Sequence, residues 1–150
     1  MNIDPAFVIG KNELITSAKD ILLGTNVAPL APILGNKSEQ PVIGASVHLD
    51  DVAFMHVKAL DERVPAGTYI ASSGGLEGTQ WQEATRVVEE TYPDAVKKGV
   101  LVNDGVQPTR KLQVDASLTE KVFGFKFLGY DEQVKSVVSH YLELVGEKGE

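Results

Sequence analysis

The stretch Ile3-Asp4-Pro5-Ala6-Phe7-Val8-Ile9-Gly10 is a mostly apolar segment that ends at a glycine. Such a run is typical of a buried β-strand that leads into a turn. A buried strand needs neighbours on both sides, because each of its N–H and C=O groups requires a hydrogen-bond partner. This strand is expected immediately after Met1, so we expect part of its sheet to come from outside these 150 residues.

Downstream, short apolar runs alternate with segments of helical periodicity. Further strands are predicted at residues 42–49, 67–71 and 111–114. Helices are predicted at residues 12–24, 50–60, 79–92, 115–123 and 131–145, and the tail Gly146–Glu150 is expected to fray. The alternation predicts a single α/β domain over residues 1–150, and the small number of strands predicts an incomplete sheet.

Residues 25–42 contain Pro29, Pro32, Gly35 and Pro41 and have little periodicity, which predicts a long loop. Long loops in compact domains are often lids or binding loops, so a lid-like role is one interpretation. The other interpretation is a plain surface connection, and the sequence leaves both open.

The composition is that of an ordinary globular protein, with 43% hydrophobic and 23% charged residues. A net charge of −7 argues against nucleic-acid and anionic-membrane partners, because both require a basic surface. The absence of cysteine excludes disulfides and thiolate catalysis. The apolar runs are too short to span a bilayer, and no signal-peptide pattern is present, so a cytoplasmic location is the default expectation.

Five segments, in order along the chain, resemble elements of the extended short-chain dehydrogenase/reductases. They are Ile3–Gly10, Val47–His56, Gly67–Ile70, Thr79–Glu83 and Asp115–Phe125. The first resembles the N-P-x-F-V-x-G-P turn after the catalytic helix, and the second resembles the V-H/D-V-x-D-V-A-x-x-H-V element. The others resemble the G-R-Y-I strand, the S-W-Q-E helix start and the D-N-S-K-x-x-x-L-G-F element. The likeness is to the fungal and plant ketone reductases of the NAD-dependent epimerase/dehydratase type, such as dihydroflavonol reductase-like and methylglyoxal reductase-like enzymes.

This resemblance implies the C-terminal part of a Rossmann-type fold, whose intact members reduce a ketone or aldehyde with NADP. The family binds that cofactor on an N-terminal glycine-rich loop and uses a catalytic Tyr-x-x-x-Lys. In Ser73–Gly78 the glycines stand in the wrong order, and Glu77 would repel phosphate. The chain has four tyrosines, and none of them is followed by a lysine four residues later: Tyr69, Tyr92, Tyr130 and Tyr141. We therefore expect no cofactor binding and no NADP-dependent oxidoreductase activity from this chain alone.

The resemblance also implies where the cofactor and the substrate would lie. Pro5 would contact NADP if the N-terminal half were present, and Asp4 stands where the family has asparagine beside the nicotinamide. The substrate pocket would accept a small apolar or aromatic carbonyl compound, and its expected lining is Phe7, Val8, Lys11, Pro29, Leu30 and Leu34.

The remaining acidic, histidine and tryptophan side chains are expected to have structural rather than catalytic roles. Asp50-Asp51 is expected to cap a helix rather than to form a paired-carboxylate site. His56 is expected as a core histidine bonded to a backbone carbonyl, and His140 is expected on the solvated side of the last helix. Trp81 is expected in the core rather than against an aromatic substrate. No metal-ligand spacing is present, so no metal site is predicted.

Three functions fit these observations. The first is the substrate-binding C-terminal portion of an NADP-dependent ketone or aldehyde reductase, which is not redox-competent alone. The second is a naturally shortened homologue that acts as a cofactor-independent isomerase, cyclase or dehydratase in small-molecule biosynthesis, with Asp4 or His48 as catalytic candidates. The third is a non-catalytic partner subunit that docks through strand addition. An open strand edge favours association in every case, so we expect a homodimer or a complex with the missing N-terminal half.

Overall fold

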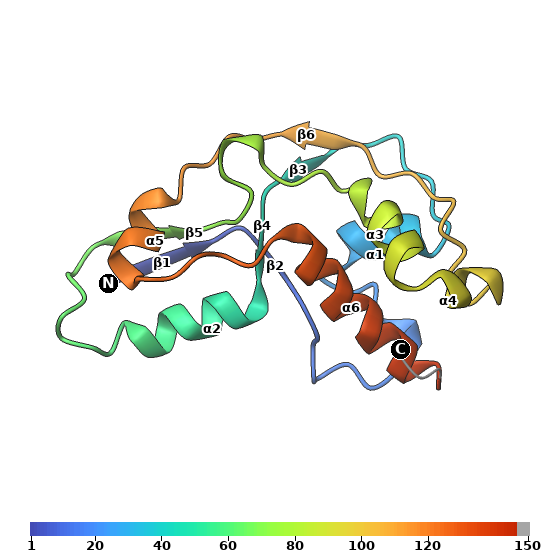
Figure 1. Cartoon of the computed structure of the whole chain (residues 1–150), viewed down its shortest axis with the longest axis horizontal. Coiled ribbons are helices and arrows are strands. Elements are labelled where there is room, and N and C mark those ends of the chain that lie inside the picture. The colour runs from blue at the N-terminus through green and yellow to red at the C-terminus, as the bar shows by residue number, and fades with distance from the viewer. Residues whose placement is uncertain (147–150) are drawn as a thin grey trace.

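The computed structural model describes residues 1–146 (Figure 1), so the predicted fraying of the tail falls almost entirely outside the described residues. Within that range the strands form three parallel pairs. These pairs are β1 (Asn2–Pro5) with β5 (Thr68–Ala71), β2 (Phe7–Ile9) with β4 (Ser46–His48), and β3 (Val42–Gly44) with β6 (Thr109–Lys111). The helices that surround them confirm the predicted α/β class with an incomplete parallel sheet.

The predicted strand at Ile3–Gly10 is confirmed, but it is divided at Ala6. The backbone N–H of Ala6 donates to the carbonyl of Ala71, whereas that of Phe7 donates to the carbonyl of Ala45. The chain therefore changes neighbours between β1 and β2. Pro5 lies at this change, and it has no N–H with which to continue a ladder.

The helices confirm much of the predicted pattern. They are α1 (Val27–Ile33), α2 (Leu49–Lys58), α3 (Glu83–Thr91), α4 (Pro93–Lys97), α5 (Ser117–Phe123) and α6 (Tyr130–Leu144), with single 3-10 turns η1 (Ala18–Asp20) and η2 (Gly75–Glu77). In Figure 1, α2 lies along β1 and β5, whereas α1, α3 and α6 gather at the other end of the molecule. As predicted, α3 ends just before Pro93 and α5 ends at Gly124, whose φ of 71° suits glycine.

The prediction of a helix over residues 12–24 is wrong. Only η1 is helical there, and Leu14 is 90% exposed although the pattern placed it on the apolar face. Side chains compete with helical bonding in this segment, because Asn12 Oδ1 accepts from the N–H of Leu14 and Ser17 Oγ accepts from the N–H of Lys19. Ile21 is buried and Ile15 and Leu22 pack against the larger core cluster, so these local turns bury part of the predicted apolar face without a continuous helix.

The prediction of a loop through residues 25–42 is wrong for residues 27–33, which form helix α1. This helix is buried in the core through residues that include Ala28, Leu30 and Ile33. Pro29 lies in its first turn, where a backbone N–H has no intrahelical partner to lose. Pro29 is therefore compatible with a short helix, whereas Pro32 lies inside α1 and removes one possible intrahelical hydrogen bond. The lid-like interpretation does not suit residues 27–33, which are packed inside the core.

Two apolar clusters form the core. The larger lies among α1, α3 and α6 and contains Trp81, as predicted. The smaller joins β4, α2, β5 and α5 through Val47, Met55, Tyr69 and Phe123. Trp81 is fully buried, and its ring centroid lies 5.9 Å from that of Phe7 and 5.7 Å from that of Tyr130. Trp81 therefore packs against other aromatic rings of the core rather than against a substrate, as predicted.

Helix capping differs from the predicted pattern at two places. The N-cap of α2 is His48, whose Nδ1 accepts from the N–H of Asp50 at 3.0 Å. Asp51 is buried and accepts from the N–H of Leu128 at 2.8 Å, so it fixes the segment before α6 rather than capping α2. Thr79, where the helix predicted over residues 79–92 was expected to start, does not cap α3, because its Oγ1 is hydrogen-bonded to Ser46 Oγ and α3 begins at Glu83.

Burial raises the pKa of the Asp51 carboxyl, against the opposing effect of the hydrogen bond from Leu128. Because its pKa is raised in the folded state, this carboxyl stabilises the fold at pH values below the ordinary carboxyl pKa. This stabilisation is lost as the pH rises through the folded-state pKa. Asp51→Asn keeps an acceptor for Leu128 without the buried charge. We therefore expect the stability of this variant, relative to wild type, to increase from acid to neutral pH in urea unfolding curves. A constant difference between the two proteins at all pH values would contradict this assignment.

The last two histidines also differ from expectation. His140 is 3% exposed rather than solvated, because the segment after β2 crosses its side of α6, where Ser136 and Glu143 both bond to Lys11. His56 is bonded to the carbonyl of Val52 as predicted, but it is exposed rather than in the core. Among residues 1–146, no helix has the length and apolar character needed to cross a membrane.

Candidate functional site

A cavity of about 600 Å³ lies at the carboxyl ends of β1, β5 and β6, and we call it the smaller cavity. Its lining is mostly apolar and consists of Asp4, Pro5, Ala6, Phe7, Val8, Thr25, Ile43, Ala45, Ile70, Ser72, Leu112 and Val114. In open parallel sheets, ligands bind outside the carboxyl ends of the strands. The position and the lining therefore suit a small apolar molecule with a polar group at one end.

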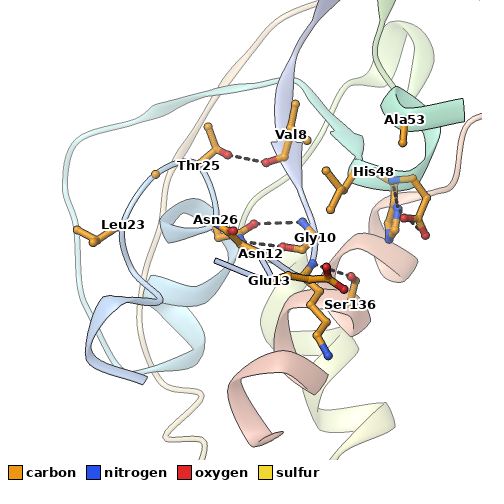
Figure 2. A pocket seen from close by; sticks show the side chains of 14 residues that line it. Val8, Gly10, Asn12, Glu13, Leu23, Thr25, Asn26, His48, Ala53 and Ser136 are labelled. Atoms are coloured by element: carbon orange, nitrogen blue, oxygen red, sulfur yellow. Dashed lines mark hydrogen bonds and ion pairs between the residues drawn. The ribbon is translucent and has the colours of Figure 1, made fainter. Parts of the chain in front are cut away.

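A second cavity of about 870 Å³, the larger cavity, shares Val8 and Thr25 with the smaller one. Figure 2 shows the residues that line it, which are Val8, Gly10, Lys11, Asn12, Glu13, Leu23, Gly24, Thr25, Asn26, His48, Leu49, Asp50, Ala53 and Ser136. They come from the end of β2, the segment before α1, the start of α2 and the middle of α6. Polar side chains are more frequent here than in the smaller cavity.

Hydrogen bonds to the end of β2 hold one wall of the larger cavity in place (Figure 2). Asn26 accepts from the N–H of Gly10 at 3.1 Å and donates to the carbonyl of the same residue at 2.8 Å. The hydroxyl of Thr25 donates to the carbonyl of Val8. These bonds explain why the segment before α1 follows β2 closely although it forms no strand.

His48 is a buried member of the larger cavity. Because its Nδ1 accepts from the N–H of Asp50, the neutral ring carries its proton on Nε2. The Asp50 carboxylate lies 3.7 Å from the same Nδ1. This nitrogen faces a backbone donor, so the arrangement differs from the one in which a carboxylate orients a histidine base.

The two catalytic candidates are not brought together. Asp4 lines the smaller cavity with Pro5, whereas His48 lines the larger one. An acid–base pair made of Asp4 and His48 is therefore not formed within either cavity. Among the described residues, no group of three or more potential ligands could hold a metal ion.

Of the predicted pocket residues, some reach a cavity and others do not. Phe7 and Val8 line the smaller cavity, and Lys11 lines the larger one, where its amine pairs with Glu143 at 2.6 Å. The residues expected from the supposed loop do not line either cavity, since Pro29 and Leu30 lie buried in α1 and Leu34 packs against the core.

The sequence analysis missed several residues of the smaller cavity, namely Ile43, Ala45, Ile70, Leu112 and Val114. They lie within or just after three strands, β3, β5 and β6, that are far apart in the sequence. Their only signal was apolar character near a predicted strand end, and this signal alone does not distinguish cavity residues from core residues.

The glycine-rich segment Ser73–Gly78 is a packed turn. The N–H groups of Ser73 and Thr79 donate to the carbonyls of Ser46 and Gly44, and the N–H of Gly78 donates within the turn. A Cβ at Gly78 would lie 2.7 Å from the Gly44 carbonyl oxygen. The N–H groups of Ser73 and Gly78 are thus bonded within the protein and are not free to bind a phosphate group.

Comparison with known proteins begins with sequence. No protein-family profile matches the chain. It is 36% identical to ketoreductase CTB6 of Cercospora nicotianae over 150 residues, which is 96% of this chain and 42% of that protein. It is 34% identical to the NAD-dependent epimerase/dehydratase ALT6 of Alternaria alternata over 91% of this chain and 41% of that protein. The chain thus spans less than half the length of these relatives.

Solved structures show the same partial coverage. Yeast methylglyoxal/isovaleraldehyde reductase Gre2, complexed with NADPH, superposes with a TM-score of 0.66 at 22% identity, over 97% of this chain and 46% of that one. Vestitone reductase from alfalfa gives a TM-score of 0.62 at 20% identity, over 93% of this chain and 43% of that one. In sequence and in fold, the chain therefore matches the C-terminal part of an extended short-chain dehydrogenase/reductase.

Proposed function

We propose that this chain is the substrate-binding C-terminal part of an NADP-dependent ketone or aldehyde reductase, and that hydride transfer requires the remaining part of the enzyme. The observation that carries the proposal is the smaller cavity, which lies at the carboxyl ends of parallel strands and has an apolar lining. The similarity to ketoreductase CTB6 supports a carbonyl compound as the substrate.

In this proposal the side chains of the smaller cavity bind and orient the substrate. Phe7, Val8 and Ile70 contact its apolar part and exclude water. NADPH would be held mainly by the other part of the enzyme and would supply the hydride. This chain offers the nicotinamide end the turn at Asp4 and Pro5, where the Asp4 carboxylate lines the cavity and is able to accept a hydrogen bond from the nicotinamide amide. The described residues that fit the cofactor are confined to this turn.

The test is a fusion in which the N-terminal part of ketoreductase CTB6 precedes residues 1–150 of this chain. We expect the chain alone to oxidise no NADPH with a panel of aromatic and aliphatic ketones, and the fusion to do so. NADPH consumption measured by absorbance, with product identified by mass spectrometry, decides the outcome. Ketone-dependent NADPH oxidation by the chain alone would contradict the proposal, as would a folded, NADPH-binding fusion that reduces no carbonyl compound.

Filling the smaller cavity should weaken substrate binding in that fusion. Ile70 is 42% exposed and lines the cavity, so Ile70→Trp places an indole where the ketone would lie. We expect KM to rise about tenfold or more, which corresponds to the loss of about 1.4 kcal/mol of binding. The control is Val106→Trp, because Val106 is similarly exposed at 44% but lines neither cavity. Equal kinetics in the two variants would place the substrate elsewhere.

A cofactor-independent isomerase, cyclase or dehydratase is the second candidate, and the position of Asp4 in the smaller cavity favours it. A carboxylate beside an apolar pocket is able to remove a proton from a carbon next to a carbonyl group. Conversion of a ketone by the chain alone, lost in Asp4→Asn, would select this function over the reductase. Conversion that persists in Asp4→Asn would exclude this role for Asp4.

Three kinds of association are proposed for this chain. Association with an N-terminal half, a homodimer and docking as a non-catalytic subunit on a longer reductase all follow from the open strand edge. Light scattering of the isolated chain at micromolar concentration separates them in part, because a stable monomer would contradict the homodimer.

A further inference from the structure

Two consecutive serines follow β5, and both are buried, with Ser72 at 2% and Ser73 at 4% exposure. Side chains alternate between the two faces of an extended strand. In β5, Tyr69 and Ala71 are buried in the smaller apolar cluster, whereas Ile70 is exposed and lines the smaller cavity. Continued by two residues, this alternation places the Ser72 side chain on the side of the cavity and the Ser73 side chain on the opposite side.

The hydrogen bonds of Ser73 agree with this placement. Its N–H donates to the carbonyl of Ser46 at 2.8 Å, and its hydroxyl donates to the same oxygen at 3.1 Å. The side-chain amide of Gln133, a fully buried residue of α6, donates to the Ser73 hydroxyl oxygen at 2.8 Å and to the carbonyl of Leu128 at 3.2 Å. These bonds hold Ser73 inside the protein and fix the backbone from which Ser72 faces the cavity.

The hydroxyl of Ser72, in contrast, has only a weak partner. It donates to the carbonyl of Ser73 at 3.4 Å, which is longer than the about 2.5–3.0 Å of an ordinary O–H···O hydrogen bond. The other hydroxyl among the described lining residues belongs to Thr25, and it donates to the carbonyl of Val8. The ionised carboxylate of Asp4 is an acceptor only. In this part of the chain, Ser72 therefore carries the side-chain hydrogen that is most available to an oxygen atom of a ligand.

Strand register gives the separation between Ser72 and the turn at Asp4. In the β1–β5 pair (Figure 1), Asp4 lies opposite Ile70, two residues before Ser72. With about 4.8 Å between strands and about 3.3 Å per residue along a strand, the Cα atoms of Asp4 and Ser72 are about 8 Å apart. This is about the length of a substituted aromatic ring. A ligand that reaches from one to the other has polar groups at opposite sides of such a ring.

We infer that Ser72 is a specificity-determining residue of the smaller cavity, and that its hydroxyl donates to a second oxygen of the substrate, one ring away from the carbonyl that is reduced. The inference rests on the proposed function and names the substrate class as an aromatic ketone with a hydroxyl group at the far side of its ring. A methyl group in place of that hydroxyl has nearly the same size, but it leaves Ser72 with only its weak bond, so the methyl compound binds less tightly.

The test compares two ketones of nearly equal size, para-hydroxyacetophenone and para-methylacetophenone, in the CTB6 fusion described above. We expect the KM of the wild-type fusion to be about tenfold lower for the hydroxyl compound. In Ser72→Ala this preference should fall to about twofold or less, because the variant loses the hydrogen bond to the ligand. The change should come from a higher KM for the hydroxyl compound, with the KM for the methyl compound nearly unchanged.

Ser73→Ala is the matched control, because Ser73 is similarly buried but is bonded on the opposite side of the strand. It should lower the midpoint of urea unfolding, since Gln133 loses an acceptor, and it should keep the preference for the hydroxyl compound. If Ser73→Ala does not fold, Ser38→Ala replaces it, because Ser38 lines neither cavity. A purely structural Ser72 would behave like Ser73, with lower stability and an unchanged preference.

Two results would overturn the inference. One is a wild-type fusion without a preference for the hydroxyl compound, and the other is a preference that persists in Ser72→Ala. If the fusion reduces neither ketone, NMR titration of the chain with each ketone gives the same ratio from dissociation constants, and failure of the hydroxyl compound to bind also overturns the inference.

These outcomes are separate from those of the proposed function, which the wider ketone panel decides. A fusion that reduces ketones with the same preference in wild type and Ser72→Ala supports the reductase proposal and refutes the role of Ser72. A chain that binds the hydroxyl compound through Ser72, in a fusion that reduces no carbonyl compound, does the opposite.

Discussion

Replacing Trp81 with alanine should lower the free energy of unfolding by about 4 kcal/mol, which is a large part of the stability of a domain of this size. Trp81 is fully buried and packs against both Phe7 and Tyr130. Its Nε1 also donates to the carbonyl of Ile43 at 3.1 Å, so the truncation removes apolar contacts and one of two hydrogen bonds to that carbonyl, which keeps the N–H of Ala45 as a donor. Urea unfolding followed by circular dichroism measures the loss, because the variant has no tryptophan fluorescence.

Two controls separate these contributions. Trp81→Phe keeps an aromatic ring in the core and should cost about 1 to 2 kcal/mol, since it loses volume and the hydrogen bond to Ile43. Leu14→Ala should change stability by less than about 0.5 kcal/mol, because Leu14 is 90% exposed. A cost for Trp81→Ala as small as that of Leu14→Ala would show that the indole does not occupy the core.

Replacing Asn26 with alanine should cost about 3 kcal/mol, because the N–H and the C=O of Gly10 both lose their partner in a buried place. These two bonds hold the segment before α1 against β2 and form a wall of the larger cavity. Amide hydrogen exchange at Gly10 should accelerate together with the loss of stability. Urea unfolding and exchange of this amide therefore report on the same two bonds.

Asn12→Ala is the matched control for Asn26. Asn12 also accepts a hydrogen bond from a backbone N–H, that of Leu14, but it is exposed, so its loss should cost less than about 1 kcal/mol. Asn26→Asp keeps the acceptor for the N–H of Gly10 and sets an oxygen against the Gly10 carbonyl, so it should also destabilise. Similar effects of Asn12→Ala and Asn26→Ala would contradict the buried position of this contact.

Elements with a strong local pattern were predictable from the sequence. The apolar run at Thr68–Ala71 is a strand, and α6 buries Val134, Val137, Val138 and Leu142 as its periodicity indicated. Here the period of the apolar residues and the surface that they bury agree, so local preference and tertiary packing favour the same structure.

Elements whose local pattern and packing disagree were not predictable in this way. Residues 12–24 have a helical pattern but only a 3-10 turn, because nothing covers Leu14 and local side chains bond to the backbone. Helix α1 contains Pro29 and Pro32, yet burial of Leu30 and Ile33 stabilises it. Likewise the covered side of His140 depends on the segment that follows β2.

The amino-acid sequence by itself determined the α/β class, most strands and the later helices, because these follow from the spacing of apolar residues along a short stretch of chain. The resemblance of its motifs to a known family also selected Phe7 and Val8 as pocket residues, and both line the smaller cavity. Only the tertiary structure decided that Ile43, Ile70 and Leu112 line the same cavity, and that Asp4 and His48 lie in different ones. Those relations depend on which strands pair and how the crossovers pack, and they join residues that have no common local pattern.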